Sequence, residues 1–207
     1  MIGQPDVAAP RLRRIAWWLT AATIGWNALE AIVALVSGVV ASSIALVGFG
    51  LESVIEVSSA LVIVWLLAHP AGEMTERIER RAVRLIALSF FALAAYLVAD
   101  SAARLLGVGL EPEQSLPGLV LVTLSLVVMP LLAWAKRRVA AALGSVSLRA
   151  DSAQTQLCTY VSAVVLVGLG ANALAGWWWM DPLAGVGVAA IAVREGWEAW
   201  RSGDLCC

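Results

Sequence analysis

Two glutamates stand four residues apart in a stretch that carries no other charge. Glu52 and Glu56 lie within residues 42–68, which are otherwise almost entirely apolar. An ionised carboxylate at the centre of a membrane helix costs about 2.5–3.5 kcal/mol, and two of them at positions i and i+4 share one helix face and repel each other. No lysine or arginine is expected at that depth. The pair therefore predicts a divalent cation or protons as its partner; the alternative is two protonated glutamates that hydrogen bond to other helices.

A second polar pair has the same spacing. Gln154 and Cys158 lie in another apolar stretch, with Asp151 one turn before Gln154. A lone cysteine in an apolar helix is often only a small hydrophobic filler, but a thiolate together with carboxylates suits zinc or a similar borderline metal. Gln154 is a weak neutral ligand or a hydrogen-bond partner of a ligand. We expect a metal site made by Glu52, Glu56, Cys158 and Gln154.

Further polar residues interrupt the apolar stretches. We expect them either to line the pathway of the metal and support its ligands, or to tie helices together. They are Asn27, Glu30, Asp100, Asp151 and Asp181.

The composition places these residues in a membrane protein. Of the 207 residues, 61% are hydrophobic and 14% charged, whereas a soluble domain carries about a quarter charged residues. Because a helix needs about 20 residues to cross the hydrocarbon core, the apolar stretches predict a polytopic all-α fold and one transmembrane domain, residues 1–207. Residues 1–14 and 201–207 would lie outside the membrane. The expected spans are 15–36, 42–68, 83–106, 116–134, 150–169 and 182–200.

The basic residues predict the orientation. Thirteen of the fourteen lysines and arginines fall on one side of these spans, and Arg104 is the exception. Because positive charge concentrates in cytoplasmic segments, we expect both termini in the cytoplasm, six spans rather than five, and insertion in a bacterial inner membrane. The tryptophans at 17–18 and 177–179 would then lie at the inner and outer interfaces. No nucleic-acid partner is expected.

These residues also resemble a known family, the cation diffusion facilitators (cation efflux proteins). The resemblance runs through the first two helices, the fifth helix and the start of the sixth. It is carried by Asn27 to Glu56 with Gly38, Ser42-Ser43, Ala45-Leu46 and Glu52-Ser53-x-x-Glu56, by Ala150-Asp151-x-x-Gln154-x-x-x-Cys158, and by Asp181-Pro182-x-Ala184. It implies a tetrahedral four-ligand site between helices two and five, alternating access, zinc efflux driven by inward proton flow, and a homodimer.

The sequence also departs from that family's pattern. Gln154 and Cys158 stand where histidine and aspartate are typical, and glutamates replace the shorter aspartates of helix two. Glutamine cannot titrate, so the proton stoichiometry stays open. The chain ends soon after the sixth span, and we expect a short member without the family's cytoplasmic C-terminal domain. Cys206 and Cys207 could bind incoming metal, accept palmitate or form an unstructured end.

The expected function is therefore divalent cation transport, with zinc export in exchange for protons and no permanently bound cofactor. The metal would pass Asp151 on its way to the ligands. A metal-binding sensor or partner regulator without transport is the alternative. An enzyme is not expected, because the single histidine, His69, lies at a span end and the chain has no CxxC motif, serine–histidine pairing or phosphate-binding glycine loop. A passive channel is disfavoured, since several negative ligands hold a metal too tightly for rapid conduction.

Overall fold

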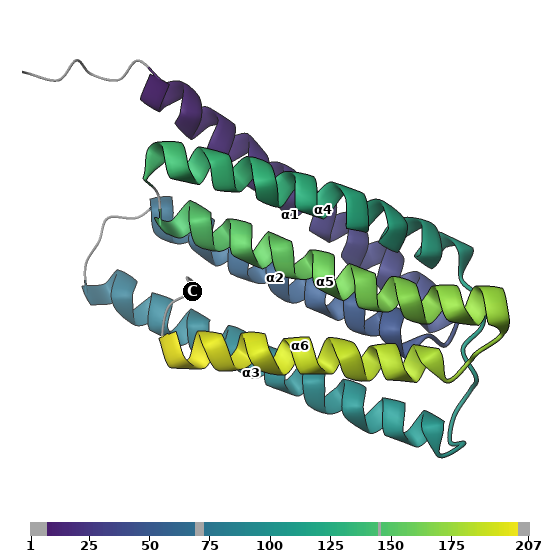
Figure 1. The fold of residues 1–207 in the computed structure, drawn as a ribbon. Helices are drawn as coiled ribbons and strands as arrows, with labels where there is room; N and C mark the ends of the chain where they lie inside the picture. The colour runs from purple at the N-terminus through teal and green to yellow at the C-terminus, as the bar shows by residue number, and fades with distance from the viewer. Residues whose placement is uncertain (1–7, 69–72, 145, 203–207) are drawn as a thin grey trace, which may run out of the picture.

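The computed structural model describes residues 8–68, 73–144 and 146–202, and throughout these ranges the chain is a bundle of helices (Figure 1). His69, Cys206 and Cys207 lie outside the described residues. Six helices follow one another along the chain. They are α1 (Ala8–Val40), α2 (Ile44–Ala68), α3 (Glu73–Leu105), α4 (Leu116–Leu143), α5 (Val146–Ala175) and α6 (Met180–Ser202).

The expected all-α membrane fold is confirmed, but the helices are longer than the apolar stretches. α1 begins at Ala8 rather than near residue 15, and α4 continues to Leu143 rather than ending near residue 134. Hydropathy marks only the part of a helix that lies in hydrocarbon, whereas the backbone hydrogen-bond pattern continues into the polar interface. This extension of α4 brings Lys136 into a helix instead of a loop.

Five of the described helices are long and apolar enough to cross a membrane. The exception, α6, contains several charged residues, among them Asp181, Arg194, Glu195 and Glu198. It nevertheless packs along α3 and also contacts α2 and α5, and it runs through the bundle beside α3 (Figure 1). Asp181 is buried in the bundle, whereas Arg194 and Glu198 form an ion pair at the surface of α6.

α2 occupies the centre of the arrangement. It contacts α1, α3, α5 and α6, while α4 packs against α1 and α5. α1 and α4 lie on one side of α2 and α5, and α3 and α6 lie on the other (Figure 1). A polar residue on α2 can therefore meet side chains from several helices without facing lipid.

The break between α1 and α2 differs from the expected one. The expected spans left residues 37–41 between the two helices, but α1 continues to Val40, and Ser42 makes the turn with a left-handed φ of 52°. Gly38 instead permits close packing, because a Cβ atom there would lie 2.8 Å from the backbone nitrogen of Val47. Gly38 therefore serves a contact between α1 and α2.

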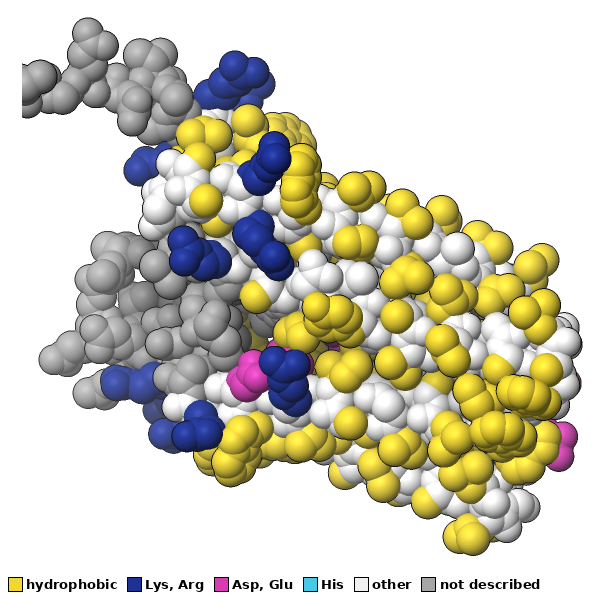
Figure 2. Space-filling view, viewed as in Figure 1, with side chains coloured by type: hydrophobic (Ala, Val, Ile, Leu, Met, Phe, Trp, Pro, Cys, Tyr) yellow, Lys and Arg dark blue, Asp and Glu magenta, His cyan; other side chains and the backbone are white. Residues whose placement is uncertain are grey.

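The two ends of the bundle differ in charge. Lysine and arginine side chains gather at the end where α1 begins and α6 ends (Figure 2). We call this the basic end and define it by the exposed Arg11, Arg80, Arg149 and Arg201. Apolar side chains cover the surface between the two ends in the same view, as a lipid-facing surface requires.

At the opposite end, Asp181 joins α6 to α2. Its carboxylate accepts hydrogen bonds from Ser43 Oγ at 2.5 Å, from the Ile44 amide at 2.8 Å and from the Ala45 amide at 3.5 Å. The two amides belong to the first turn of α2, where backbone N–H groups have no partner within the helix. α2 has no acidic residue of its own in that turn. Asp181 is thus an N-terminal cap supplied by another helix, and this contact sets the height of α2 against α6.

Candidate metal centre

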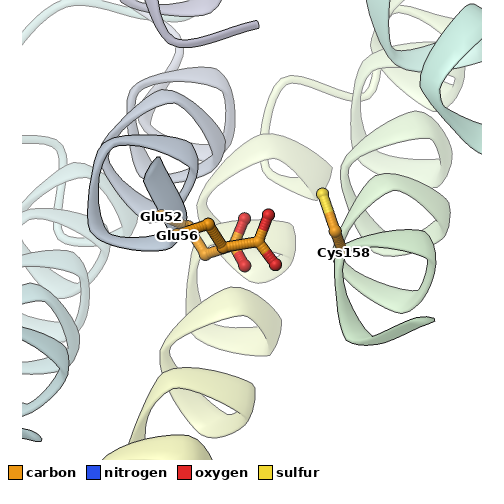
Figure 3. Close-up of side chains that lie close together, drawn as sticks. All are labelled: Glu52, Glu56 and Cys158. Atoms are coloured by element: carbon orange, nitrogen blue, oxygen red, sulfur yellow. The ribbon is translucent and has the colours of Figure 1, made fainter. Parts of the chain in front are cut away.

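Three predicted ligands come together between α2 and α5. One ligand atom from each of Glu52, Glu56 and Cys158 lies within 4.8 Å of the other two, and all three residues are buried. The i, i+4 spacing puts both glutamates on the same face of α2. Their carboxylates point toward α5, where Cys158 lies opposite them (Figure 3). The two carboxylates and the thiol therefore form one compact group of donor atoms.

The carboxylates are incompletely satisfied by the protein. Glu52 Oε2 and Glu56 Oε1 are buried and have no hydrogen-bond partner. A buried acceptor without a partner is costly, and a buried charge is retained only when it is paired or coordinates a metal. Two oxygen donors and one sulfur donor are a suitable set for a borderline divalent cation such as zinc.

Gln154, the fourth expected ligand, is tied to α2 by a hydrogen bond. Its amide Nε2 donates to Ser59 Oγ at 2.8 Å, which ties α5 to α2 about one turn beyond Glu56. The structure thus gives Gln154 a helix-bridging hydrogen bond.

α1 supplies the side chains that support the centre. Asn27 Nδ2 donates to Glu56 Oε2 at 2.7 Å. Glu30 is fully buried and accepts hydrogen bonds from Trp26 Nε1 at 2.5 Å and from Ser53 Oγ at 3.4 Å. Its Oε2 also lies 3.8 Å from the sulfur of Cys158, which donates to it. Asn27 and Glu30 therefore orient ligands from one face of α1, as their i, i+3 spacing allows.

Lys136 is a buried cation within α4, where the expected spans placed a connecting segment. Its side chain is fully buried, and Nζ lies 2.8 Å from Asp151 Oδ2 and 3.1 Å from Thr155 Oγ1. Thr20 donates to the same Asp151 oxygen at 3.4 Å. The placement of Lys136 between the fourth and fifth spans was wrong, because α4 continues past it and its side chain is buried in the bundle.

With this geometry in place, sequence comparison decides the family. Residues 21–203 match the family model of the cation efflux transmembrane domain. The chain belongs to the cation efflux family. A curated transporter of Synechocystis sp., described as uncharacterized, is 29% identical over 171 residues, which cover 78% of this chain and 54% of that relative. The chain thus spans about half the length of the relative it matches.

Two of the predicted pathway residues lie away from the centre of this cation efflux domain. Asp100 forms an ion pair with Arg104 at 2.6 Å, and Arg104 also donates to the carbonyls of Ser42 and Leu110. Asp181 caps α2, about 12 Å along that helix from Glu52 at 1.5 Å per residue. Both acidic residues therefore hold helix ends and loops together at the end opposite the basic end.

Proposed function

We propose that this cation efflux protein transports a divalent metal cation, best fitted by zinc, with Glu52, Glu56 and Cys158 as its ligands. The proposal rests on the buried group of donor atoms within 4.8 Å of one another, between two helices of an integral membrane protein. A purely structural role would leave two buried carboxylate oxygens without a partner. A divalent cation satisfies both and offsets the charge of the carboxylates.

The spacing of the donors is compatible with zinc. Zinc bonds to carboxylate oxygen and to thiolate sulfur are about 2.0–2.3 Å long, so neighbouring tetrahedral ligands lie about 3.5 Å apart. Small side-chain rotations bring Glu52, Glu56 and Cys158 to that spacing. The fourth tetrahedral position is left to water, or to Gln154 after it leaves Ser59.

The same ligands couple transport to protons. Metal binding requires deprotonated carboxylates and a thiolate, so a cation that binds releases protons. Protonation on the far side of the membrane then weakens the site and releases the cation. Alternating exposure of the centre between α2 and α5 exports the metal in exchange for protons. The proposal includes a homodimer and no enzymatic activity.

Zinc flux into proteoliposomes under an imposed pH gradient tests the proposal. We expect Glu52→Gln and Glu56→Gln to abolish flux, because each removes a negative ligand, while Glu111→Gln at an exposed loop position leaves it unchanged. Flux at the parental rate in both centre variants would show that the site is wrong. Zinc binding without flux in the parent protein would favour a metal sensor over a transporter.

A further inference from the structure

Asn27 of α1 has a buried amide of which only one end is satisfied. The residue is 3% exposed. Its Nδ2 donates to Glu56 Oε2 at 2.7 Å in a hydrogen bond that is itself buried. Its Oδ1 is also buried and has no hydrogen-bond partner among the described residues. Because a buried acceptor without a partner is costly, the hydrogen bond to Glu56 explains only half of this side chain.

The packing of α1 against α2 places the Asn27 amide at the metal centre. Asn27 meets Glu56, as the 2.7 Å hydrogen bond shows. Three residues further along α1, Glu30 accepts a hydrogen bond from Ser53 Oγ at 3.4 Å, three residues before Glu56 on α2. The two contacts therefore belong to one continuous face of α1. Glu30 on that face also accepts from Cys158 of α5, so the face borders expected ligands from both α2 and α5.

The free oxygen of Asn27 lies close to the ligand atoms. The oxygen and nitrogen of an amide are about 2.3 Å apart. With Nδ2 at 2.7 Å from Glu56 Oε2, Asn27 Oδ1 therefore lies within about 5 Å of that carboxylate oxygen. Glu56 Oε1 and Glu52 Oε2 are likewise buried without a partner among the described residues. Amide and carboxylate oxygens only accept hydrogen bonds, so these three atoms cannot satisfy one another, whereas one cation can satisfy all of them.

Asn27 is better placed than Gln154 for the fourth position of the centre. Gln154 would first have to give up its hydrogen bond to Ser59. Asn27 Oδ1 has no such bond to lose. Its Nδ2 can continue to donate to Glu56 Oε2 while Asn27 Oδ1 and Glu56 Oε1 bind the same cation. The hydrogen-bonded amide and carboxylate then act together as a pair of oxygen ligands.

We propose that Asn27 Oδ1 is the fourth ligand of the divalent cation, beside Glu52, Glu56 and Cys158; this proposal rests on the transport function above. The ligand set then has three oxygens and one sulfur, and α1 contributes to it as well as α2 and α5. An amide oxygen is neutral, so it completes the coordination without adding charge to two carboxylates and a thiolate. It is also a hard donor, and position 27 therefore takes part in the choice between oxygen-preferring and sulfur-preferring cations.

Substitution by cysteine tests whether position 27 touches the metal. Affinity alone would not decide this, because loss of a residue that only hydrogen bonds to a ligand also changes metal affinity by about 10–100-fold. Cobalt bound to a thiolate produces a charge-transfer absorption band whose intensity grows with the number of cobalt–sulfur bonds. In a reduced Cys206→Ser/Cys207→Ser background, Cys158 is the remaining cysteine. We expect Asn27→Cys to raise the band per bound cobalt about twofold, because two thiolates then bind the metal.

Asn172 provides the matched control. It is a buried asparagine of α5 whose Nδ2 donates to the Pro112 carbonyl at 3.0 Å. It lies about 21 Å along α5 from Cys158 at 1.5 Å per residue. Asn172→Cys should therefore leave the band per bound cobalt at the parental intensity. A band in Asn27→Cys no stronger than the parental one overturns the proposal, as does an equal increase in Asn172→Cys.

A second pair of variants separates the oxygen of Asn27 from its hydrogen bond. Asn27→Asp keeps an oxygen in place of Oδ1 but loses the amide group that donates to Glu56, whereas Asn27→Leu loses both. Cobalt titrations should give Asn27→Asp an affinity at or above the parental value and Asn27→Leu an affinity at least about tenfold lower. Equal losses in the two variants would mean that only the hydrogen bond to Glu56 matters, and the proposal would be wrong.

The cobalt band also separates this proposal from the function on which it rests. A parental band that does not increase in Asn27→Cys disproves the role of Asn27 and leaves the centre of Glu52, Glu56 and Cys158 intact. Absence of any thiolate band in the parent protein disproves the centre itself, and the fourth ligand with it.

Discussion

At the scale of single residues, the thiol of Cys158 distinguishes this centre from one built only of oxygen ligands. Sulfur binds zinc and cadmium well, whereas manganese prefers oxygen. We expect Cys158→Ser to reduce zinc and cadmium flux about tenfold or more and to reduce manganese flux much less. Mutating a residue that only hydrogen bonds to a metal ligand already lowers metal affinity by about 10–100-fold, so loss of a ligand should cost at least as much. Parallel flux measurements with the three metals check this. Equal losses for all three would mean that the thiol does not set selectivity.

The ion pair between Lys136 and Asp151 yields a second prediction for single residues. Removing one member of a buried pair costs about 3–5 kcal/mol, whereas replacing both with apolar residues is often neutral. Lys136→Met should therefore lower the unfolding temperature in detergent, and Lys136→Met/Asp151→Leu should recover most of the loss. Thermal unfolding followed by circular dichroism at the helix band measures the unfolding temperature of both variants. A double variant no more stable than the single one would contradict the pairing.

The candidate metal centre could be predicted only in part from the sequence. The spacing of Glu52 and Glu56 and that of Gln154 and Cys158 follow from helix periodicity, so their shared faces were predictable. The side-chain partners were not, because they depend on how helices are rotated against each other. Gln154 donates to Ser59, while Glu30 of α1 contacts the sulfur. Periodicity within one helix contains no information about either contact.

At the scale of helices, the cap at Asp181 determines how α2 stands against α6. Loss of an N-terminal cap costs about 0.5–2 kcal/mol, and here the cap also joins two helices. We expect Asp181→Ala to lower the free energy of unfolding by about that amount and to slow zinc flux, with Asp181→Asn in between because its carbonyl oxygen still accepts hydrogen bonds. Chemical unfolding and proteoliposome flux measure the two effects. Unchanged stability in Asp181→Ala would argue against the cap.

The helices themselves were more predictable than their ends. Apolar length identified six elements in the correct order, because burial in hydrocarbon is a property of composition. It could not show that α1 continues past Gly38 or that α4 includes Lys136. Those boundaries depend on packing, since Gly38 is required by the approach of Val47.

At the scale of the whole molecule, the orientation depends on whether α6 crosses the membrane. Five helices qualify by apolar length alone, and five crossings would place the chain ends on opposite sides. Thirteen of the fourteen basic residues fall on one side of the expected spans. This placement favours six crossings with both ends in the cytoplasm. The basic end would then be cytoplasmic.

Thiol labelling of intact cells tests this orientation. In a Cys206→Ser/Cys207→Ser background, we expect an impermeant maleimide to label Glu111→Cys, in the loop between α3 and α4, without disruption of the cells. Arg201→Cys near the end of α6 should be labelled only after permeabilisation. The unsubstituted background is the control, because the buried Cys158 should not react. Labelling of both positions in intact cells would mean that α6 does not span and that the two ends of the chain lie on opposite sides of the membrane.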